Sequence, residues 1–387
     1  MRILHISGAL SARYGGVAQV VDGLSSAQAS LGHDVTVITS MRLHERDELI
    51  RPAGAKVVVS LEDKLEKIWA GHSTGLRRDI EESLSGTDIV HVHGIWHYPS
   101  FLGSKLAYRE EIPYIIAPHG SLDSWCLEYK KTKKKIYMGL VQRKQILGAS
   151  LVHAITDTEA EVVKMLLPGV RTKTIQNGVD IPQTDIFEDV LAFEKLFPWL
   201  ANRKIILFMG RIHPKKGIDV LIRAFAEITR TNVQHVLVIA GPDEVGLKSE
   251  LQELARELEV EDMVFFTGFV EGETKTRLLS AAEIFVLPSH SEGFSIAILE
   301  AMAYAKPVII STACGFPEVA VENAGIIVRP DSHELAKAMH RVLTSTNLAK
   351  EMGANGRRMI ERRYSWDRIA EETIEMYNEA ITLGPRS

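Results

Sequence analysis

Short apolar runs alternate with amphipathic segments along most of the chain, and this alternation constrains the fold more than any other feature. In the first half, a helical period appears at residues 17–31, among the runs RILHIS, DVTVIT, DIVHVH, YIIAP and LVHAI. Wholly apolar strands separated by helices are typical of parallel sheets that helices cover on both faces. The pattern therefore predicts βαβ units and an α/β fold.

The same alternation starts again in the second half. A helical period at residues 217–231 lies among the runs KIILFMG, HVLVIA, MVFFTG, IFVLPS, PVIIS and GIIVRP. Between the halves, residues 183–202 follow neither period clearly and include Pro198. We expect two doubly wound, Rossmann-like domains at residues 1–182 and 202–365, a linker at 183–201, and a last amphipathic helix within 366–387.

Composition restricts the class of protein. The 387 residues are 45% hydrophobic and 25% charged, which suits two globular domains. A net charge of -5 argues against a general nucleic-acid binder. Cys126 and Cys314 lack metal-type spacing, the start resembles a strand rather than a signal peptide, and no run of 20 apolar residues occurs. We expect a cytoplasmic protein.

Ligands of doubly wound sheets bind beyond the carboxyl ends of the strands, so residues directly after a strand are candidates. Arg211 follows KIILFMG and Lys216 precedes the next helix, an arrangement that suits a diphosphate. Lys215 is an alternative to Lys216, and a plain basic surface loop is the other interpretation.

The stretch SHSEGFSIAILEAMA indicates a strand exit, a loop and a helix. Glu292 falls in the loop, Ser295 is the expected N-cap, and Glu300 lies inside the helix. Backbone N–H groups near Phe294 and Ser295 are then available to an anion, and the carboxylates to sugar hydroxyls. The alternative is two solvated glutamates.

In the first half, Gly15 and Gly16 lie just before a helix, where a backbone can approach a phosphate closely or simply turn. His119 follows the run YIIAP and suits a substrate hydroxyl or phosphate, or a place in the core, and Asp123 is a weaker acceptor-side candidate.

The segment HVHGIWH carries His91, His93 and His97 and raises the question of a metal. No cysteine or carboxylate nearby completes a ligand set, so we expect no metal and assign these side chains, with Trp96, to the lining of a site on the acceptor side.

Residues 128–147 combine clustered lysines with apolar side chains at helical spacing. Such a helix suits an anionic lipid surface or a phosphorylated acceptor, although a solvated helix face is the simpler interpretation. Peripheral contact with the inner face of a membrane would use this segment.

Taken together, the motifs resemble those of the retaining glycosyltransferases of family 4. The resemblance extends over nearly the whole chain: Gly15-Gly16, DIVHVHG, APHG around His119, NGVD at 177–180, GRIHPKKG around Arg211 and Lys216, AGPDE at 240–244, and EGFSIAILEAMA. It implies the GT-B fold, in which two Rossmann-like domains face a cleft and the C-terminal helix packs back on the first domain.

The resemblance also implies roles for individual residues. Arg211 and Lys216 would bind the diphosphate of a nucleotide-sugar, assisted by the backbone of Gly15 and Gly16, and would take the place of a metal. Glu300 would bind the ribose, and Glu292 and His119 the donor sugar. The remaining donor contacts would come from the main chain of Phe269, Val270, Phe294 and Ser295.

The expected reaction is transfer of a hexose from a UDP-sugar, UDP-glucose or a relative, to a saccharide or lipid-linked saccharide in the synthesis of a cell-surface polysaccharide. Departure of the nucleotide builds negative charge that Arg211 and Lys216 would stabilise. A glycosidase would not need these cations. A nucleotide-sugar epimerase of the same fold and a non-catalytic sugar-nucleotide sensor remain as alternatives.

Overall fold

The computed structural model describes the 387-residue chain except for residues 9, 12–15, 123–130, 183–202, 230–233 and 387. It divides into an N-terminal domain, made of Met1–Gly178 with Trp366–Ser387, and a C-terminal domain, Val179–Ser365. The expected linker lies outside the described residues. Residues 179–182 were expected in the first domain, but they belong to the second, where the Val179 N–H donates to the Tyr364 carbonyl at 2.8 Å.

The N-terminal domain contains a seven-stranded parallel sheet in the order β3-β2-β1-β4-β5-β6-β7. Its strands are β1 Arg2–Ser7, β2 Asp34–Met41, β3 Lys56–Leu61, β4 Ile89–His93, β5 Tyr114–Ala117, β6 Leu151–Ala154 and β7 Thr172–Thr174. The apolar runs named from sequence did not include the two edge strands. The strand β7 is a short polar run, Thr-Lys-Thr, that gives no apolar signal, whereas β3, KVVVSL, does contain an apolar run and was overlooked. The other strands confirm the α/β prediction.

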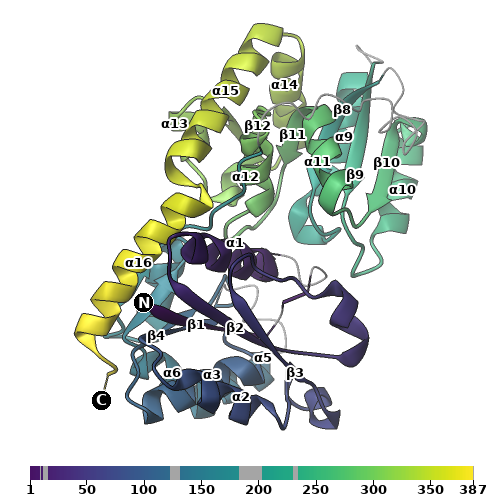
Figure 1. Cartoon of the computed structure of the whole chain (residues 1–387). Coiled ribbons are helices and arrows are strands. Elements are labelled where there is room, and N and C mark those ends of the chain that lie inside the picture. Colours follow the sequence, from purple (N-terminus) through teal and green to yellow (C-terminus); the bar gives the residue numbers. More distant parts are fainter. Residues whose placement is uncertain (9, 12–15, 123–130, 183–202, 230–233, 387) are drawn as a thin grey trace. The chain divides into compact units, whose positions relative to one another are not determined.

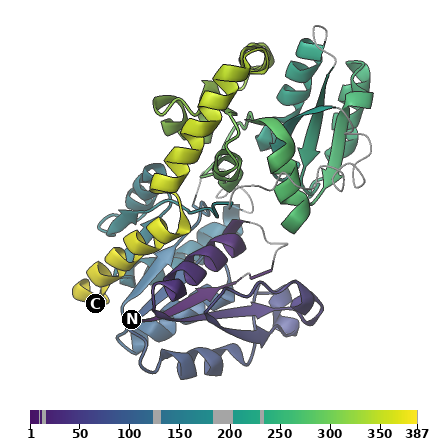
Figure 2. The same cartoon turned by 45° about the horizontal axis from the view of Figure 1, so that its top comes forward.

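Helices cover both faces of this sheet, as Figures 1 and 2 show for α1 on one side and α2 and α3 on the other. The helical elements are α1 Gly16–Ser30, α2 Leu76–Leu84, α3 Tyr98–Arg109, α5 Lys131–Tyr137, α6 Arg143–Gly148, α7 Asp157–Leu166 and α16 Trp366–Leu383, with the short turns η2 Leu43–Glu48, η3 Lys64–Lys67 and η4 Met138–Gln142.

The two faces of the N-terminal sheet bury different chemistry because strand side chains alternate. Leu4 of β1 and Val90 of β4 belong to an apolar core with Ile80 of α2 and Leu106 of α3. The opposite face carries a set of buried histidines beneath α1 and α16: His5, His91, His93 and His153. One sheet thus separates an apolar layer from a polar one.

The C-terminal helix α16 returns to the N-terminal domain and packs on α1. A Cβ atom at Gly23 of α1 would lie 2.1 Å from Trp366 Cε2, so only glycine admits the indole at this point. A Cβ atom at Gly178 would also collide with this ring, at 2.5 Å from Trp366 Cε3. The glycines therefore let the first turn of α16 seat closely on the domain.

The C-terminal domain contains a six-stranded parallel sheet in the order β10-β9-β8-β11-β12-β13. Its strands are β8 Lys204–Met209, β9 His235–Ala240, β10 Val264–Gly268, β11 Ala282–Leu287, β12 Val308–Ser311 and β13 Gly325–Val328. Its helical elements are α9 Ile218–Thr229, α10 Lys248–Glu257, α11 Gly272–Ala281, α12 Ile296–Ala303, α13 Glu318–Val321, α14 Ser332–Leu343 and α15 Thr346–Arg363, with η7 Pro214–Lys216, η8 Glu261–Met263 and η9 Thr312–Cys314. A single apolar core joins both faces.

Both sheets reverse their strand order at a central pair. The chain runs outward from β1 to β3 on one side and from β4 on the other, and likewise from β8 to β10 and from β11. Such switch points leave a crevice at the carboxyl ends of the central strands, where ligands bind. The fold therefore directs attention to the segments after β1 and β4 and after β8 and β11.

The basic segment differs from a simple surface helix. Its described part is helical through α5, η4 and α6, and η4 is a π-helical turn. Ile146 belongs to the domain core, and the Tyr137 ring contacts Trp69 and Trp96, whereas Ile136 is 57% exposed. Much of the apolar face of this segment is thus used inside its own domain.

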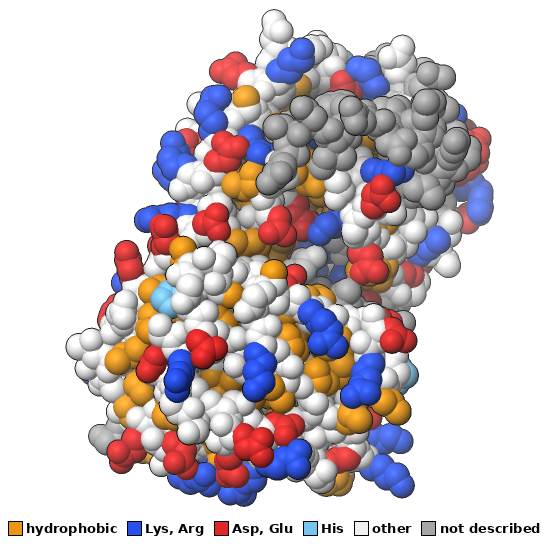
Figure 3. All heavy atoms as spheres, viewed as in Figure 1, with side chains coloured by type: hydrophobic (Ala, Val, Ile, Leu, Met, Phe, Trp, Pro, Cys, Tyr) orange, Lys and Arg blue, Asp and Glu red, His pale blue; other side chains and the backbone are white. Residues whose placement is uncertain are grey.

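None of the described helices has the length and apolarity that crossing a bilayer requires. On the face of the N-terminal domain seen in Figure 3, acidic and basic side chains are interspersed. That face carries no broad field of one sign, in keeping with the modest net charge of -5.

Candidate functional site

In the C-terminal domain, the loop after β8 lies against the segment that leaves β11. A Cβ atom at Gly217 would lie 2.2 Å from the Pro288 carbonyl oxygen, and Gly217 has a φ of 66°, so this approach requires glycine. The His290 N–H donates to the Lys215 carbonyl at 2.7 Å. These contacts bring residues near 216 and 292 together at the switch point.

Lys216 and Glu292 form an ion pair through Lys216 Nζ and Glu292 Oε1. Ser289 Oγ donates to the same carboxylate oxygen at 2.8 Å, and the Glu292 N–H donates to the Ala313 carbonyl. The side chains of Lys216 and Glu292 are only 12% and 7% exposed, so neither charge is well solvated. The sequence interpretation gave these residues separate partners, whereas the structure joins them.

Glu300 lies on α12, whose N-cap is Ser295 as expected, although the serine hydroxyl makes no capping hydrogen bond. Glu300 Oε1 accepts a hydrogen bond from Lys275 Nζ of α11 at 2.7 Å, and the side chains of Glu300 and Lys275 are 14% and 24% exposed. Sequence analysis missed Lys275, since no local pattern reveals which helix faces Glu300. Phe269, 49% exposed, and the half-buried Val270 lie between β10 and α11, in the loop expected to hold the base.

The start of α12 is fixed by aromatic packing. The Phe294 ring lies 5.6 Å from the Phe316 ring and 6.2 Å from the Tyr364 ring, measured between centroids. Phe294 therefore anchors the turn before the helix, and the first N–H groups of α12 have no intrahelical acceptor. This geometry suits an anion near Ser295.

Arg211 pairs with a different carboxylate from the one that Lys216 contacts. Its Nη1 donates to Glu244 Oε2 at 3.1 Å, with both side chains about half exposed. A Cβ atom at Gly241 would lie 1.9 Å from the Gly210 carbonyl oxygen, so the AGPDE loop approaches the Arg211 loop closely. Of the two cations expected at the diphosphate, Lys216 is thus shielded and Arg211 exposed.

In the N-terminal domain, His119 follows β5 and lies in a turn that the Ser121 N–H closes by donating to the Pro118 carbonyl at 3.2 Å. It has a φ of 53°, a left-handed conformation that costs a non-glycine residue energy and is common at functional sites. The following Gly120 N–H donates to Glu159 Oε1 at 2.6 Å, and Ile155 donates to the other oxygen. The buried carboxylate of Glu159 therefore holds the loop in place.

His119 borders a cavity of about 290 Å³ at the carboxyl ends of β1, β4 and β5. His97 lines the same cavity, and Trp96 is fixed nearby by a 3.3 Å hydrogen bond from Nε1 to the Ser121 carbonyl. Gly16 begins α1, whereas Gly15 and Asp123 lie outside the described residues. The cavity is lined by Ser7, Gly8, Val17, Arg42, Glu62, Glu66, Ala70, Gly71, His93, Gly94, His97, Pro118, His119 and Ser121.

Burial keeps His119 neutral, because desolvation lowers its pKa to about 3. Its Nε2 forms a 2.9 Å hydrogen bond with His93 Nδ1. Burial also lowers the pKa of His97. Neutral imidazoles, rather than imidazolium cations, therefore border this cavity at pH 7.

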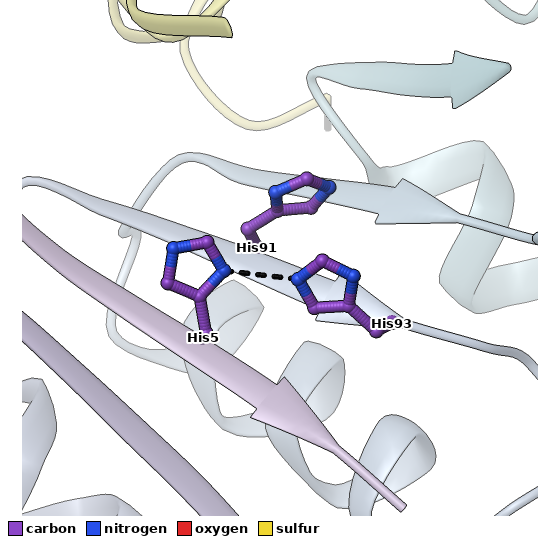
Figure 4. Close-up of side chains that lie close together, drawn as sticks. All are labelled: His5, His91 and His93. Carbon is purple, nitrogen blue, oxygen red and sulfur yellow. Dashed lines mark hydrogen bonds between the residues drawn. The ribbon is translucent and has the colours of Figure 1, made fainter. Parts of the chain in front are cut away.

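Close behind His119, His5, His91 and His93 lie near enough to hold a metal (Figure 4). Each ring nitrogen of this trio already has a protein partner. His5 bonds to His93 and Gln28, His93 also to His119, and His91 to Tyr377 and His153. A cation would have to break these bonds, so hydrogen bonding accounts for the cluster.

Comparisons with known proteins identify the family of this chain. Residues 14–183 match the family Glycosyltransferase Family 4, and residues 194–359 match Glycosyl transferases group 1. The D-inositol 3-phosphate glycosyltransferase of Salinispora arenicola is 31% identical over 92% of this chain and 82% of its own length. The alpha-maltose-1-phosphate synthase of Mycolicibacterium smegmatis is 30% identical over 75% of this chain and 79% of its own.

Among solved structures, HepE of Anabaena in complex with UDP and glucose superposes with a TM-score of 0.77. The match covers 98% of this chain and 99% of that chain at 20% identity, which shows a common fold. The two sheets of seven and six strands are the two Rossmann-like domains of the GT-B fold. The chain therefore belongs to the family 4 (group 1) glycosyltransferases of the GT-B fold and is an enzyme of that class.

Proposed function

We propose that this glycosyltransferase moves a hexose, with retention of anomeric configuration, from a UDP-sugar such as UDP-glucose to a phosphorylated saccharide, free or lipid-linked. The observation that carries the donor part is the pair of lysine–carboxylate contacts at the switch point of the C-terminal sheet, Lys216–Glu292 and Lys275–Glu300. The UDP and glucose bound to HepE, a protein of the same fold, support the choice of donor.

Each contact suits one part of such a donor. Lys216 is shielded and contacts Glu292 in the loop before α12, so it would neutralise a phosphate of the diphosphate in a site of low dielectric. Glu292 would then exchange part of its contact with Lys216 for a sugar hydroxyl. Glu300 would accept from the ribose hydroxyls, in competition with Lys275.

The chemical step is stabilisation of the departing nucleotide. As the bond between the anomeric carbon and the phosphate oxygen lengthens, positive charge grows on the sugar and negative charge on the diphosphate. Lys216 and the exposed Arg211 would stabilise the negative charge on the diphosphate. In other nucleotide-sugar enzymes a divalent cation has this role. We therefore expect activity in the presence of a chelator.

The acceptor proposal has two supports. The names of both curated relatives contain a phosphorylated small molecule, inositol 3-phosphate or maltose 1-phosphate. Lys134 of the basic segment also lies over Trp96, which we expect on the acceptor side, with its Nζ 5.3 Å from the ring centroid. Because much of the apolar face of this segment packs internally, a phosphate is favoured over a lipid surface as its partner.

The first test is calorimetry and donor hydrolysis with UDP-, GDP- and ADP-sugars in the presence of EDTA. We expect one UDP-hexose to bind tightly and to be hydrolysed slowly to an α-sugar, which NMR of the anomeric proton identifies. Lys216→Ala should abolish both signals. Epimerised donor without an acceptor would replace this proposal by the epimerase, and binding without any turnover would favour the sensor.

The second test adds sugar phosphates and unphosphorylated sugars as acceptors and follows UDP release. Acceleration by phosphorylated acceptors alone is the expected result. Equal acceleration by unphosphorylated sugars would contradict the acceptor assignment but leave the donor intact. Activity only with lipid-linked acceptors in vesicles would place the reaction at a membrane.

A further inference from the structure

A continuous chain of hydrogen bonds runs through the polar layer of the N-terminal domain. It starts at the Ile175 carbonyl, which lies 2.8 Å from His153 Nε2. His153 Nδ1 lies 3.3 Å from His91 Nε2, and His91 Nδ1 lies 2.7 Å from Tyr377 Oη. The first half of the chain thus links β6, β4 and the C-terminal helix α16.

The second half leads from α16 to the cavity. Gln28 Nε2 of α1 donates to Tyr377 Oη at 3.1 Å, and Gln28 Oε1 lies 2.8 Å from His5 Nε2. His5 Nδ1 lies 2.9 Å from His93 Nε2, the contact drawn in Figure 4. His93 Nδ1 lies 2.9 Å from His119 Nε2, where the chain ends.

The five imidazoles that this chain of hydrogen bonds connects are neutral at pH 7. Burial lowers the pKa of His5 and of His153 to about 4 and that of His119 to about 3. Burial likewise lowers the pKa of His91 and His93 well below the usual range. Each ring therefore carries one N–H donor and one bare nitrogen.

Neutrality fixes the direction of every bond, starting from an end that can only accept. The Ile175 carbonyl must receive the proton of His153 Nε2, which leaves His153 Nδ1 bare. His91 must then donate from Nε2 and accept at Nδ1, and Tyr377 must donate to it.

The same reasoning continues to the cavity. Because Tyr377 Oη donates to His91, it accepts from Gln28, whose amide oxygen then accepts from His5 Nε2. His93 donates from Nε2 to His5 Nδ1, and His119 donates from Nε2 to His93 Nδ1. The opposite direction would require His153 to donate from both nitrogens and so to carry a charge.

We propose that this chain of hydrogen bonds fixes His119 as the tautomer with its proton on Nε2. Gln28 and Tyr377 are then positioning residues, which present His119 Nδ1 as a hydrogen-bond acceptor. The structure records no partner for His119 Nδ1 among the described residues. An acceptor selects a ligand that donates, which is a hydroxyl and not a deprotonated phosphate. The sequence analysis left both open for His119.

This inference deepens the proposed function and rests on it only for the ligand, a hydroxyl of the donor sugar. It also gives the C-terminal helix α16 a role in the site. Tyr377 does not line the cavity, yet it decides which of two near-equivalent states the His119 ring adopts. Without its hydroxyl, the Gln28 amide is free to rotate and offer its NH₂ to His5, which reverses the His5–His93–His119 segment.

The test is NMR of the histidine rings in the ¹⁵N-labelled full-length protein without ligand, with His119 assigned from His119→Gln. We expect wild-type His119 to carry its proton on Nε2, and Tyr377→Phe to add a population with the proton on Nδ1. Tyr114→Phe is the matched control, because it removes another buried phenol hydroxyl that takes no part in the chain of hydrogen bonds. This hydroxyl is bonded to the Gln145 carbonyl at 2.7 Å. It should leave the His119 spectrum unchanged.

Kinetics with deoxyfluoro donors supplies the second readout, since fluorine accepts but does not donate. Wild type should lose about tenfold in kcat/KM for the donor fluorinated at the contacted hydroxyl, the effect of one oriented hydrogen bond. In Tyr377→Phe this penalty should shrink, whereas Tyr114→Phe should retain it. A general loss of structure would lower all donors together.

A proton on Nδ1 of wild-type His119, or an unchanged His119 spectrum in Tyr377→Phe, would overturn the proposal. If Tyr377→Phe does not fold, Gln28→Met cuts the same chain one bond further along and should give the same spectrum. If no sugar nucleotide binds at all, the proposed function fails, and the spectra of the free protein still decide the tautomer.

Discussion

The two domains share a strand order around their central strands but bury different side chains. The N-terminal sheet places histidines in the interiors of β1, β4 and β6, and these lead by hydrogen bonds to the rim at His119. The C-terminal sheet has an apolar interior, and its lysine–carboxylate pairs lie in segments beyond the strands. The same sheet topology thus supports two arrangements at the strand ends. In the N-terminal domain, buried side chains of the sheet hold the residue at the strand end, whereas in the C-terminal domain the ion pairs form among the segments beyond the strands.

The difference teaches where the candidate residues of each domain are vulnerable. Charges on the C-terminal rim are balanced locally, so single substitutions there should act on ligand binding and on the remaining partner charge. The N-terminal rim depends on groups several bonds away, so it should respond to protonation of the interior. The following experiments test this contrast.

The largest effect is expected at Lys216. Lys216→Ala removes the cation expected at the leaving diphosphate and leaves Glu292, 7% exposed, without its ion pair. We expect kcat/KM for the donor to fall by about 100-fold or more, and the free energy of unfolding by about 3 kcal/mol. Steady-state kinetics and denaturant titration measure the two.

Lys215→Ala is the matched control, since it removes the adjacent lysine and should change neither quantity by much. The double variant Lys216→Met with Glu292→Gln should recover part of the lost stability without recovering activity, because no buried charge is then unpaired. Equal loss of activity on substitution of either lysine would instead show that both lysines bind the phosphate.

Acid should unfold the N-terminal domain first. The histidines His5 and His153 have a pKa of about 4 when folded and an ordinary value near 6.5, so the unfolded chain binds more protons between these values. The contribution of each of these histidines to the free energy of unfolding is fully present above about pH 6.5. It falls by about 3 kcal/mol for each histidine as the pH drops toward 4.

Hydrogen exchange followed by mass spectrometry at pH 7 and 4.5 measures this for each domain in the same sample. Protection in β1 and β4 should fall well before that in β8 and β9. Earlier loss in the apolar C-terminal sheet would reverse the comparison.

A moderate effect is expected at Glu300. Glu300→Gln removes the charge that would bind the ribose, and we expect UDP to bind about tenfold more weakly. Lys275→Met should weaken UDP far less, because Lys275 competes for the same carboxylate at 2.7 Å. Calorimetry decides, and a larger loss for Lys275→Met would make Lys275 the ligand-binding group.

The smallest effect is expected at the exposed pair Arg211–Glu244. Both side chains are about half exposed, so Glu244→Gln should change the free energy of unfolding by less than about 0.5 kcal/mol. Denaturant titration measures this, with Glu334→Gln, which removes another exposed arginine partner, as a reference. A loss above about 2 kcal/mol would show that this rim contact is structural.

Much of the architecture could be predicted because apolar strands and amphipathic helices have distinct periods. The strand β8, at the start of the second run of alternating elements, and the last helix, α16, appear where the pattern indicates them. The edge strand β7 could not be found in this way, because a short Thr-Lys-Thr run carries no apolar period and pairs only through its backbone.

The candidate site divides in the same way. Its positions at strand exits follow from parallel topology, which is why Lys216, Glu292 and His119 could be named from sequence. The partner of Glu300 could not, since Lys275 comes from another helix, nor could the exposed contact of Arg211 with Glu244.

The sequence by itself determined the two βα domains, the glycosyltransferase family motifs and the strand-end placement of the candidate residues, because periodicity and local motifs are properties of neighbouring residues. Only the tertiary structure decided that Lys216 neutralises Glu292 and that Tyr377 joins Gln28 and His91, residues far apart in the chain. The direction of the histidine chain, and with it the acceptor character of His119, depends on burial that long-range packing alone creates.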